Sequence, residues 1–380
     1  MLAAEFFAGI GLVRLALEPA GFKVAVSNDI EAAKKEMYAT HFGVTEGHQY
    51  MLGDIANVKG EQMPDGLAVA WASFPCTDLS LAGSRRGLAG SESSTFFEWI
   101  RILEEMGDDG RPRVVAAENV VGLATSHGGD DLRTAVRELN ELGYSVDVVT
   151  LDARRFVPQS RSRLFLIGSL EQVAPAVNPD PVLRPEWLQF VFDDPDLVTH
   201  QAALPTPPPL LTRGFTALAD RVPPGDLWWD EKRTKAFLDS LSPMQAERLS
   251  KLKSSRTTQY RTAYRRTRGG KPTWEIRADD IAGCLRTARG GSSKQAVVRV
   301  GRSSVQVRWM TPHEYAALMG APDYNLTGLR GLQVMFGFGD AVCVPAVAWL
   351  AKHYLAPLAK GDMRPDVGSA AAHVARAVGA

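Results

Sequence analysis

The sequence predicts an α/β protein with a doubly wound, mostly parallel sheet and a smaller, irregular inserted domain. Three observations support this prediction. Short apolar runs alternate with helix-like segments through about the first 170 residues, as in strands joined by crossover helices. From about residue 172 the alternation gives way to proline-rich segments and a basic block. Regular structure resumes at Thr311, where a Thr cap followed by Pro312 and Glu314 opens a helix.

Length and composition suggest how the chain divides. With 380 residues, 45% hydrophobic and 23% charged, it is long enough for one large and one smaller domain. We expect residues 1–172 and 306–360 to form the large domain and residues 173–305 the inserted one. Residues 361–380 are expected to be a frayed tail.

Cysteine usage and hydropathy indicate the setting. The apolar start lacks a basic n-region and carries Glu5, Arg14 and Glu18, so we expect no signal peptide. No long uncharged apolar run appears elsewhere, so no membrane partner is expected. Three widely separated cysteines without Cys-x-x-Cys spacing indicate a reducing, cytoplasmic location and no metal site.

The predicted strands and helices follow one another in a regular order. Strands are expected at 3–7, 22–27, 68–71, 114–117, 146–151 and 164–168, with a further strand before Asp54. Helices are expected from about residue 12 and at 32–40, 96–105 and 132–142, and a loop at 338–342 is expected to lead into a last apolar helix. Because ligands of such sheets bind at the carboxyl ends of the strands, residues that follow strands are the candidate site.

The first strand is followed by the turn Phe7-Ala8-Gly9-Ile10-Gly11, where glycines allow a tight turn and close approach of a ligand. Arg14 stands where a dinucleotide fingerprint has Gly or Ala. Asp29 ends the second strand and is placed to accept hydrogen bonds from ribose hydroxyls, and Asp54 is placed to accept from an adenine amino group. Each acid alone is more often a cap or turn residue, but together they predict a nucleoside site without a phosphate cradle.

Three further segments at this edge carry reactive side chains. Cys76 follows a strand and a proline, so its thiol is a candidate nucleophile, with a buried structural cysteine as the alternative. Glu118 ends another strand and would lie beside Cys76, unless it is a solvated loop residue. Arg161 and Arg163 enter a strand two residues apart, which predicts that they share one face.

The formal net charge of zero hides a basic block between Lys251 and Arg308. This block holds fifteen Lys and Arg against three acids, a net charge of about +12, and the remainder balances it. A solvated face is one interpretation. The density of charge and the interleaved aromatic residues favour a polyanion partner.

Seven segments follow one another along the chain: Phe-Ala-Gly-Ile-Gly, Gly-Asp-Ile, Phe-Pro-Cys, Glu-Asn-Val, Gln-x-Arg-x-Arg, the Thr-Pro-x-Glu helix and the Gly-Asp-Ala-Val loop. Together they resemble the ordered motifs of the cytosine-C5 DNA methyltransferases. The resemblance covers about residues 1–170 and 306–355, and the basic block falls where that family keeps its target recognition domain. It implies a class I methyltransferase, Rossmann-like fold, S-adenosylmethionine as cofactor and double-stranded DNA as partner. Separately, we expect a monomer. The implied cofactor contacts are Phe7, Gly9, Ile10, Gly11, Asp29, Ile30, Asp54, Ile55, Pro75, Phe96, Asp340 and Ala341.

The resemblance also implies catalytic roles. Cys76 would add to C6 of the cytosine, Glu118 would act at N3, and Arg163, helped by Arg161, would hold O2. Cytosine C5 is too poor a nucleophile to take a methyl group directly, and addition at C6 makes it enamine-like. The base must leave the duplex to be reached. The expected DNA contacts are Gln159, Arg286, Thr287, Arg289 and Ser292.

Four positions depart from the family's pattern: Glu5 for Asp, Leu12 for Gly, Cys284 for Thr and Asp340 for Asn. The first two look tolerable. Cys284 bears on the contacts of the recognition loop, and Asp340 places a charge near the methionine end of the cofactor.

Two other functions fit the same fold. An RNA cytosine-C5 methyltransferase is one. By the resemblance such enzymes have a reduced inserted domain, whereas the inserted segment before Thr311 here has roughly 130 residues. A catalytically silent DNA-binding relative is the other. It would have lost Cys76 or Glu118, and both are present.

Overall fold

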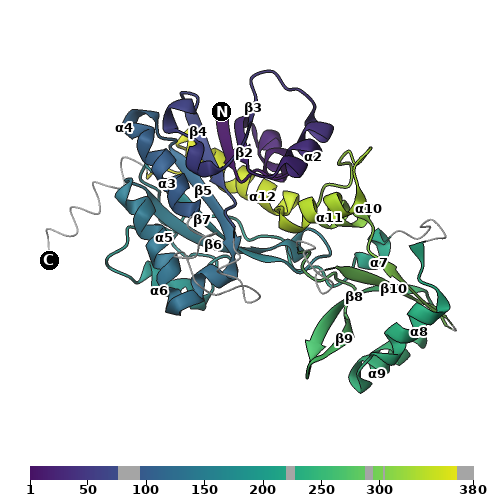
Figure 1. Ribbon diagram of the computed structural model, residues 1–380. Coiled ribbons are helices and arrows are strands. Elements are labelled where there is room, and N and C mark those ends of the chain that lie inside the picture. The colour runs from purple at the N-terminus through teal and green to yellow at the C-terminus, as the bar shows by residue number, and fades with distance from the viewer. Residues whose placement is uncertain (76–94, 220–226, 287–293, 303, 366–380) are drawn as a thin grey trace, which may run out of the picture.

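The computed structural model describes residues 1–75, 95–219, 227–286, 294–302 and 304–365, and within them the main layer is a seven-stranded sheet (Figure 1). Its order is β3-β2-β1-β4-β5-β7-β6. The strands are β1 (Leu2–Phe6), β2 (Lys23–Asp29), β3 (Gln49–Leu52), β4 (Leu67–Ala72), β5 (Val114–Val120), β6 (Ser145–Asp152) and β7 (Ser162–Ser169). Strands β1 to β5 pair in parallel, and β7 runs antiparallel to β5 and β6. The predicted doubly wound, mostly parallel sheet is confirmed.

Helices cover both faces of this sheet. One core contains residues of α1 (Leu12–Leu17) and of α10 (Pro312–Leu318), α11 (Gly331–Asp340), α12 (Val344–Leu350) and α13 (Ala356–Lys360). The other contains residues of α3 (Thr95–Glu105) and α5 (Asp130–Glu141). Within β4, Trp71 belongs to the first core and Ala70 and Ala72 to the second. Burial on both faces explains why the strands read as continuous apolar runs.

The helices after Thr311 return to the first strand and its helices. Helix α1 packs against α12, and the Tyr324 hydroxyl donates to the carbonyls of Ile10 (2.7 Å) and Met37 (3.0 Å), which belongs to α2 (Ala32–Phe42). The helical run Gly331–Lys360 is long and apolar enough to cross a membrane by composition. Since 61% of its most apolar window is buried, it also fits a core helix of the main layer.

Helix α11 differs from the sequence prediction. A loop was expected at 338–342, but the helix continues to Asp340, and residues 341–343 alone separate it from α12. A Cβ at Gly337 would lie 2.8 Å from both Ile10 Cγ2 and Met37 Sδ. Glycine is therefore required for close helix packing here, whereas the sequence interpretation took this glycine-rich stretch for a loop.

The second sheet lies to one side of the main layer, at the lower right of Figure 1. It is antiparallel, in the order β11-β10-β8-β9, with strands β8 (Gln259–Arg268), β9 (Lys271–Ile276), β10 (Gln295–Val300) and β11 (Val305–Trp309). Helices α8 (Glu231–Asp239) and α9 (Pro243–Lys253) complete a separate small core around Phe237, Leu249 and Trp274. The segment predicted as irregular thus contains a regular sheet, which its Arg- and Thr-rich strands concealed.

Residues just beyond 172 still pack on the main sheet. Leu183 and Leu188 are buried in its two cores, and the buried Arg184 guanidinium pairs with Asp147 of β6. At the other end of the insertion, β11 extends past residue 305. The domain boundaries at 172/173 and 305/306 remain predictions.

Candidate functional site

The glycine turn after β1 has the left-handed geometry that a close ligand approach requires. Gly9 and Gly11 have φ of +57° and +80°. Phe7 also has a positive φ of +56°, which is uncommon for a residue with a side chain and is a feature of functional sites. A Cβ at Gly11 would lie 2.5 Å from Phe42 Cε2, so no side chain fits there. The predicted tight turn is present.

Asp29 closes this turn onto β2. Its carboxylate accepts hydrogen bonds from the backbone N–H of Gly9 and of Glu31, both at 2.8 Å. The Tyr50 hydroxyl of β3 donates to the Gly9 carbonyl at 3.0 Å, a contact the sequence interpretation missed. Since a carboxylate offers about four acceptor positions, Asp29 keeps the capacity to accept from a ribose. Its ribose role remains a prediction.

The adjacent strand ends add a second carboxylate and an apolar surface. Asp54 caps a short 3-10 turn (Ile55–Asn57) and accepts from the Ala56 N–H at 3.0 Å. Ile30 and Leu52 are 63% and 44% exposed at the ends of β2 and β3, and Leu52 was not foreseen. Exposed aliphatic side chains can pack against the flat face of a base, and the two acids beside them can accept hydrogen bonds from a nucleoside.

Three predicted cofactor residues lie inside the protein instead. Ile10, Ile55 and Phe96 are buried. The Phe96 ring packs on Phe74 with centroids 5.1 Å apart, and Phe74 directly precedes Pro75. These three residues therefore shape the site from behind, and a direct cofactor contact remains a prediction.

Asp340, at the end of α11, is linked to the glycine turn through Lys34. Its carboxylate forms an ion pair with Lys34 Nζ of α2 at 3.3 Å. Lys34 Cδ lies 3.9 Å from where a Cβ of Gly9 would stand. The charge that departs from the family pattern is thus paired beside the predicted cofactor turn, by a lysine that the sequence interpretation did not single out.

Cys76 lies outside the described residues, which end just before it at Pro75. The segment leading to it is held in place. The Ser73 N–H donates to the Phe6 carbonyl at 3.3 Å, and the Asn119 amide donates to the Phe74 carbonyl at 3.1 Å. Asn119, the residue after Glu118, was missed as a positioning group. It ties the end of β5 to the segment that precedes the predicted nucleophile.

Glu118 and Arg163 form an ion pair between β5 and β7, with Arg163 Nε 2.8 Å from Glu118 Oε1. The two side chains are only 9% and 16% exposed. Both line a small cavity together with Arg161 and Cys343. The predicted carboxylate and arginines therefore meet at one place, although Arg161 precedes β7, which begins at Ser162.

Arg161 is committed to contacts within the protein. Its Nη1 donates to the Leu285 carbonyl at 2.9 Å and its Nη2 to the Ala341 carbonyl at 2.7 Å. Gln159, fully buried, donates from Nε2 to the Leu318 carbonyl at 2.7 Å and accepts from the Leu285 N–H at 3.0 Å. The predicted DNA contact of Gln159 and the predicted base contact of Arg161 remain predictions, and these internal contacts favour a positioning role for both.

The segment 282–286 therefore lies directly beside the candidate active centre. The Ala282 N–H donates to the Pro158 carbonyl at 2.7 Å, and the Ser160 N–H donates to the Ala282 carbonyl at 2.9 Å. Arg286 is exposed at the end of this segment. Thr287, Arg289 and Ser292 lie outside the described residues, so their DNA contacts remain predictions.

Cys284 sits among positive charges in this segment. Its Sγ is 3.4 Å from Arg161 Nη1. Burial by itself raises the pKa of the Cys284 thiol, but the neighbouring arginines outweigh that effect and the net pKa is lowered. The departure from Thr therefore introduces an acidic thiol beside the candidate centre.

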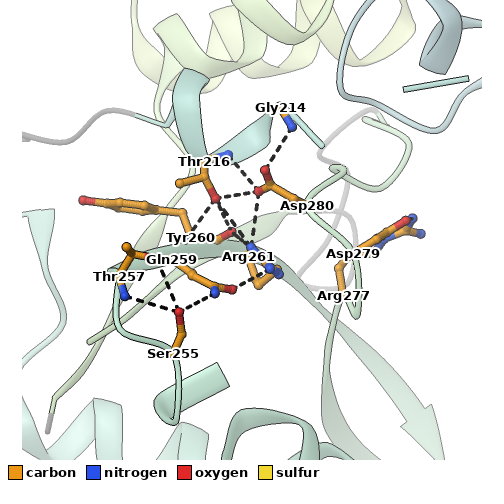
Figure 2. A network of polar contacts seen from close by, with 10 residues as sticks. All are labelled: Gly214, Thr216, Ser255, Thr257, Gln259, Tyr260, Arg261, Arg277, Asp279 and Asp280. Atoms are coloured by element: carbon orange, nitrogen blue, oxygen red, sulfur yellow. Dashed lines mark hydrogen bonds and ion pairs between the residues drawn. The ribbon is translucent and has the colours of Figure 1, made fainter. Parts of the chain in front are cut away.

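Part of the basic block forms ion pairs within the protein. Figure 2 shows Asp280 accepting bonds from Gly214 N (2.9 Å) and Thr216 N (2.8 Å), with Arg261 Nη1 3.3 Å from its carboxylate. Arg277 pairs with Asp279 at 2.9 Å. Arg308 is fully buried against Glu314 of the capping box. These three arginines hold structure together.

The remaining described cations of the block are more exposed. A two-residue turn at Gly269–Gly270 joins β8 to β9 and carries a cluster of them at the hairpin tip. The exposed residues among them are Lys251, Lys253, Arg256, Arg265, Arg266, Arg268, Lys271, Arg286 and Arg302. Within the described parts of the chain, no cluster of His, Cys, Asp and Glu suited to a metal ion is found.

Relatives with similar sequences are bacterial type II methyltransferases. M.HhaI of Haemophilus parahaemolyticus is 34% identical over 164 residues, which cover 43% of this chain and 47% of that protein. Thus the match spans about half the length of that relative. M.HaeII of Haemophilus aegyptius is 29% identical over 59% of this chain and 67% of its own. M.HpaII of Haemophilus parainfluenzae is 26% identical over 93% of this chain and 89% of its own.

Solved structures support the fold. The Dnmt2 methyltransferase of S. pombe superposes with a TM-score of 0.58 at 16% identity, covering 92% of this chain and 96% of that one. The Entamoeba histolytica methyltransferase EhMeth superposes with a TM-score of 0.60 at 13% identity, covering 96% and 99%. A family model described as C-5 cytosine-specific DNA methylase matches residues 1–356, so the chain belongs to the C-5 cytosine-specific DNA methylase family.

Proposed function

We propose that this protein transfers a methyl group from S-adenosylmethionine to C5 of a flipped-out cytosine in double-stranded DNA. The observation that carries this proposal is the ion pair between Glu118 and Arg163 at 2.8 Å. The pair lies on the strands next to the segment that leads to Cys76, and Asn119 joins the two. A carboxyl and a guanidinium held together in this way can offer both hydrogen-bond donors and hydrogen-bond acceptors to one edge of a base.

S-adenosylmethionine is proposed as the methyl donor because the strand ends of β1, β2 and β3 suit a nucleoside that carries no phosphate. The glycine turn, Asp29 and Asp54 would hold its adenosine part, with Ile30 and Leu52 against the base. The Lys34–Asp340 pair stands beside the glycine turn, where the amino-acid end would extend. When bound, the donor supplies an electrophilic methyl group.

The chain's own groups would then activate the base. The Cys76 thiolate adds to C6, which places the electron pair of the C5–C6 bond at C5 for bonding to the methyl carbon. A proton held between the Glu118 carboxyl and N3 stabilises the adduct, and Arg163 orients the ring through O2. Loss of the C5 proton to a base then allows the thiolate to leave C6, so the enzyme is restored and 5-methylcytosine and S-adenosylhomocysteine are released.

The second sheet and its exposed cations are proposed to bind the duplex. We propose that residues 173–305 form the target recognition domain, with residues 1–172 and 306–360 as the catalytic domain. The hairpin tip and the segment 282–286 present cations that suit phosphates. The enzyme is further proposed to act in the cytoplasm as a monomer.

Bisulfite sequencing of DNA from cells that express the chain tests this function. We expect protected cytosines at C5 within one short sequence context. The matched control is Cys76→Ala, which should leave no protected cytosine. A duplex with 5-fluorocytosine at the methylated position should form a denaturation-resistant adduct with the native enzyme but not with Cys76→Ala. The adduct persists because C5 of this base carries fluorine and cannot release a proton.

Assays of the same two proteins on RNA and on duplex DNA separate the two alternatives, an RNA cytosine-C5 methyltransferase and a catalytically silent DNA-binding relative. Methylation of RNA but not of duplex DNA would support an RNA enzyme. DNA binding without methylation or adduct would indicate a silent relative, and methylation that persists in Cys76→Ala would refute the covalent mechanism.

A further inference from the structure

Arg161 joins three segments that are far apart in the sequence. Its guanidinium bridges the carbonyls of Leu285 and Ala341, which lie 124 and 180 residues further along the chain. Its own backbone N–H is fixed by the Asp152 carboxylate at 2.8 Å. With a side chain only 4% exposed, Arg161 has little surface left for a ligand.

Each of the two carbonyls belongs to a different proposed binding site. Ala341 follows Asp340, whose carboxylate pairs with Lys34 beside the glycine turn. Leu285 precedes the exposed Arg286 in the proposed recognition segment. The bridge therefore runs from the cofactor side of the protein to its DNA side.

The chemistry of the bridge makes the two ends depend on each other. A guanidinium is planar, and its donors point in fixed directions, so Nη1 and Nη2 cannot move independently. Both backbone polar groups of Leu285 are hydrogen-bonded. Its N–H donates to Gln159, and its carbonyl accepts from Arg161. Displacement of the Ala341 carbonyl must either move the guanidinium against Leu285 or leave a partly buried acceptor without its donor, which is unfavourable.

We propose that Arg161 is a positioning residue that couples the two binding sites, so that the methyl-donor product and the DNA duplex strengthen each other's binding through it. The inference rests on the proposed function. Ordering of the 339–342 segment by the cofactor fixes the guanidinium, and the guanidinium fixes the start of the recognition loop. Coupling of this kind is reciprocal, and each ligand raises the affinity for the other by the same factor.

The test measures that factor. The dissociation constant of S-adenosylhomocysteine is determined by calorimetry with and without a duplex carrying the methylated site, and that of the duplex by fluorescence anisotropy with and without S-adenosylhomocysteine. For the native protein we expect both ratios to agree at about fivefold or more. In Arg161→Lys and Arg161→Met both ratios should fall to about one, because methionine has no donor and lysine carries its donors on a single freely rotating nitrogen without the rigid fork that fixes the two carbonyls relative to each other. Affinity for each ligand alone should change less than the ratio does.

Arg154→Met is the matched control. Arg154 lies in the same connection between β6 and β7 and also reaches the inserted segment, through the Leu211 carbonyl at 2.6 Å and Asp279 at 3.8 Å. Within the part of the chain that the structure describes, it makes no hydrogen bond or ion pair with Leu285 or Ala341, so its loss should leave the coupling factor at the native value. Thermal unfolding is followed for every variant, and Arg161→Lys decides the result if Arg161→Met does not fold.

The outcomes separate the inference from the proposed function. Native coupling in Arg161→Lys would overturn the inference, as would loss of coupling in Arg154→Met to the same extent. A native protein that binds both ligands with a factor of one would overturn the inference and leave the proposed function intact. A native protein that binds neither ligand would overturn both.

Discussion

Lys34 Nζ and Asp340 Oδ2 lie 3.3 Å apart, joining the first turn of α2 to the last residue of α11 beside the glycine turn. The lysine side chain is 14% exposed and the aspartate 36%. A negative charge at this position would repel the carboxylate of an amino-acid ligand, and the ammonium offsets it. We therefore expect this pairing to let the chain tolerate Asp340 where Asn is usual.

The first prediction tests this pair. Asp340→Asn should change the affinity for S-adenosylhomocysteine by about tenfold or less, equivalent to about 1.4 kcal/mol. Lys34→Met should weaken binding more, because it leaves the Asp340 charge without its partner, and adding Asp340→Asn should recover part of the loss. Calorimetric titration of the four proteins gives the interaction free energy. Lys232→Met, at an exposed position of α8, is the control, and strictly additive effects would contradict the prediction.

The second prediction concerns Glu118. Glu118→Gln keeps the size of the side chain but removes the exchangeable carboxyl proton and the ion pair with Arg163. We expect kcat to fall by about 10²- to 10⁴-fold, the usual contribution of a general acid, with duplex affinity retained. Single-turnover methylation measures the rate and anisotropy the affinity. Glu104→Gln, at an exposed position of α3, should behave as native, and a native rate in Glu118→Gln would remove Glu118 from the chemistry.

The third prediction concerns Arg286, which is exposed next to the candidate centre. Arginine pairs bidentately with guanine, so Arg286→Ala should cost about 1–3 kcal/mol at the cognate site and relax specificity at one base pair. Binding to cognate and singly altered duplexes across a salt series measures this. Arg266→Ala, on the hairpin, is expected to weaken all sequences alike. An unchanged preference profile for Arg286→Ala would place this side chain at a phosphate instead.

The fourth prediction concerns Glu5, which is 1% exposed in β1 between β2 and β4. Burial raises its pKa from 4.5 to about 8. As the pH rises through this interval the unfolded chain loses the proton while the folded protein keeps it, so the free energy of unfolding should decrease. Glu5→Gln should remove that decrease and stabilise the protein above about pH 8.

Urea unfolding followed by circular dichroism over this pH range measures the effect. Glu61→Gln, an exposed glutamate, should keep the native slope. If native and Glu5→Gln proteins lose stability with pH at the same rate, Glu5 does not carry the buried proton.

The sequence by itself determined the order along the chain of the strands of the main sheet and which residues lie near their carboxyl ends. Alternating apolar runs, the glycine turn and the cap at Thr311 are local signals, because each depends on backbone preferences within a few residues. They were enough to place Asp29, Asp54 and Glu118 at one edge of a mostly parallel sheet. That edge is common to all parallel strands, so no knowledge of packing was needed.

Only the tertiary structure decided what the polar side chains contact. Lys34 pairs with Asp340, and Arg161 bridges Leu285 and Ala341. These contacts join segments separated by more than 100 residues, and Gln159 is buried by the same kind of packing. The family resemblance implied ligand contacts for Gln159 and Arg161, but a resemblance carries over a position in a motif and not the packing around it. The direction of a side chain depends on how distant elements pack against it, and a buried donor takes whichever acceptor that packing brings within reach.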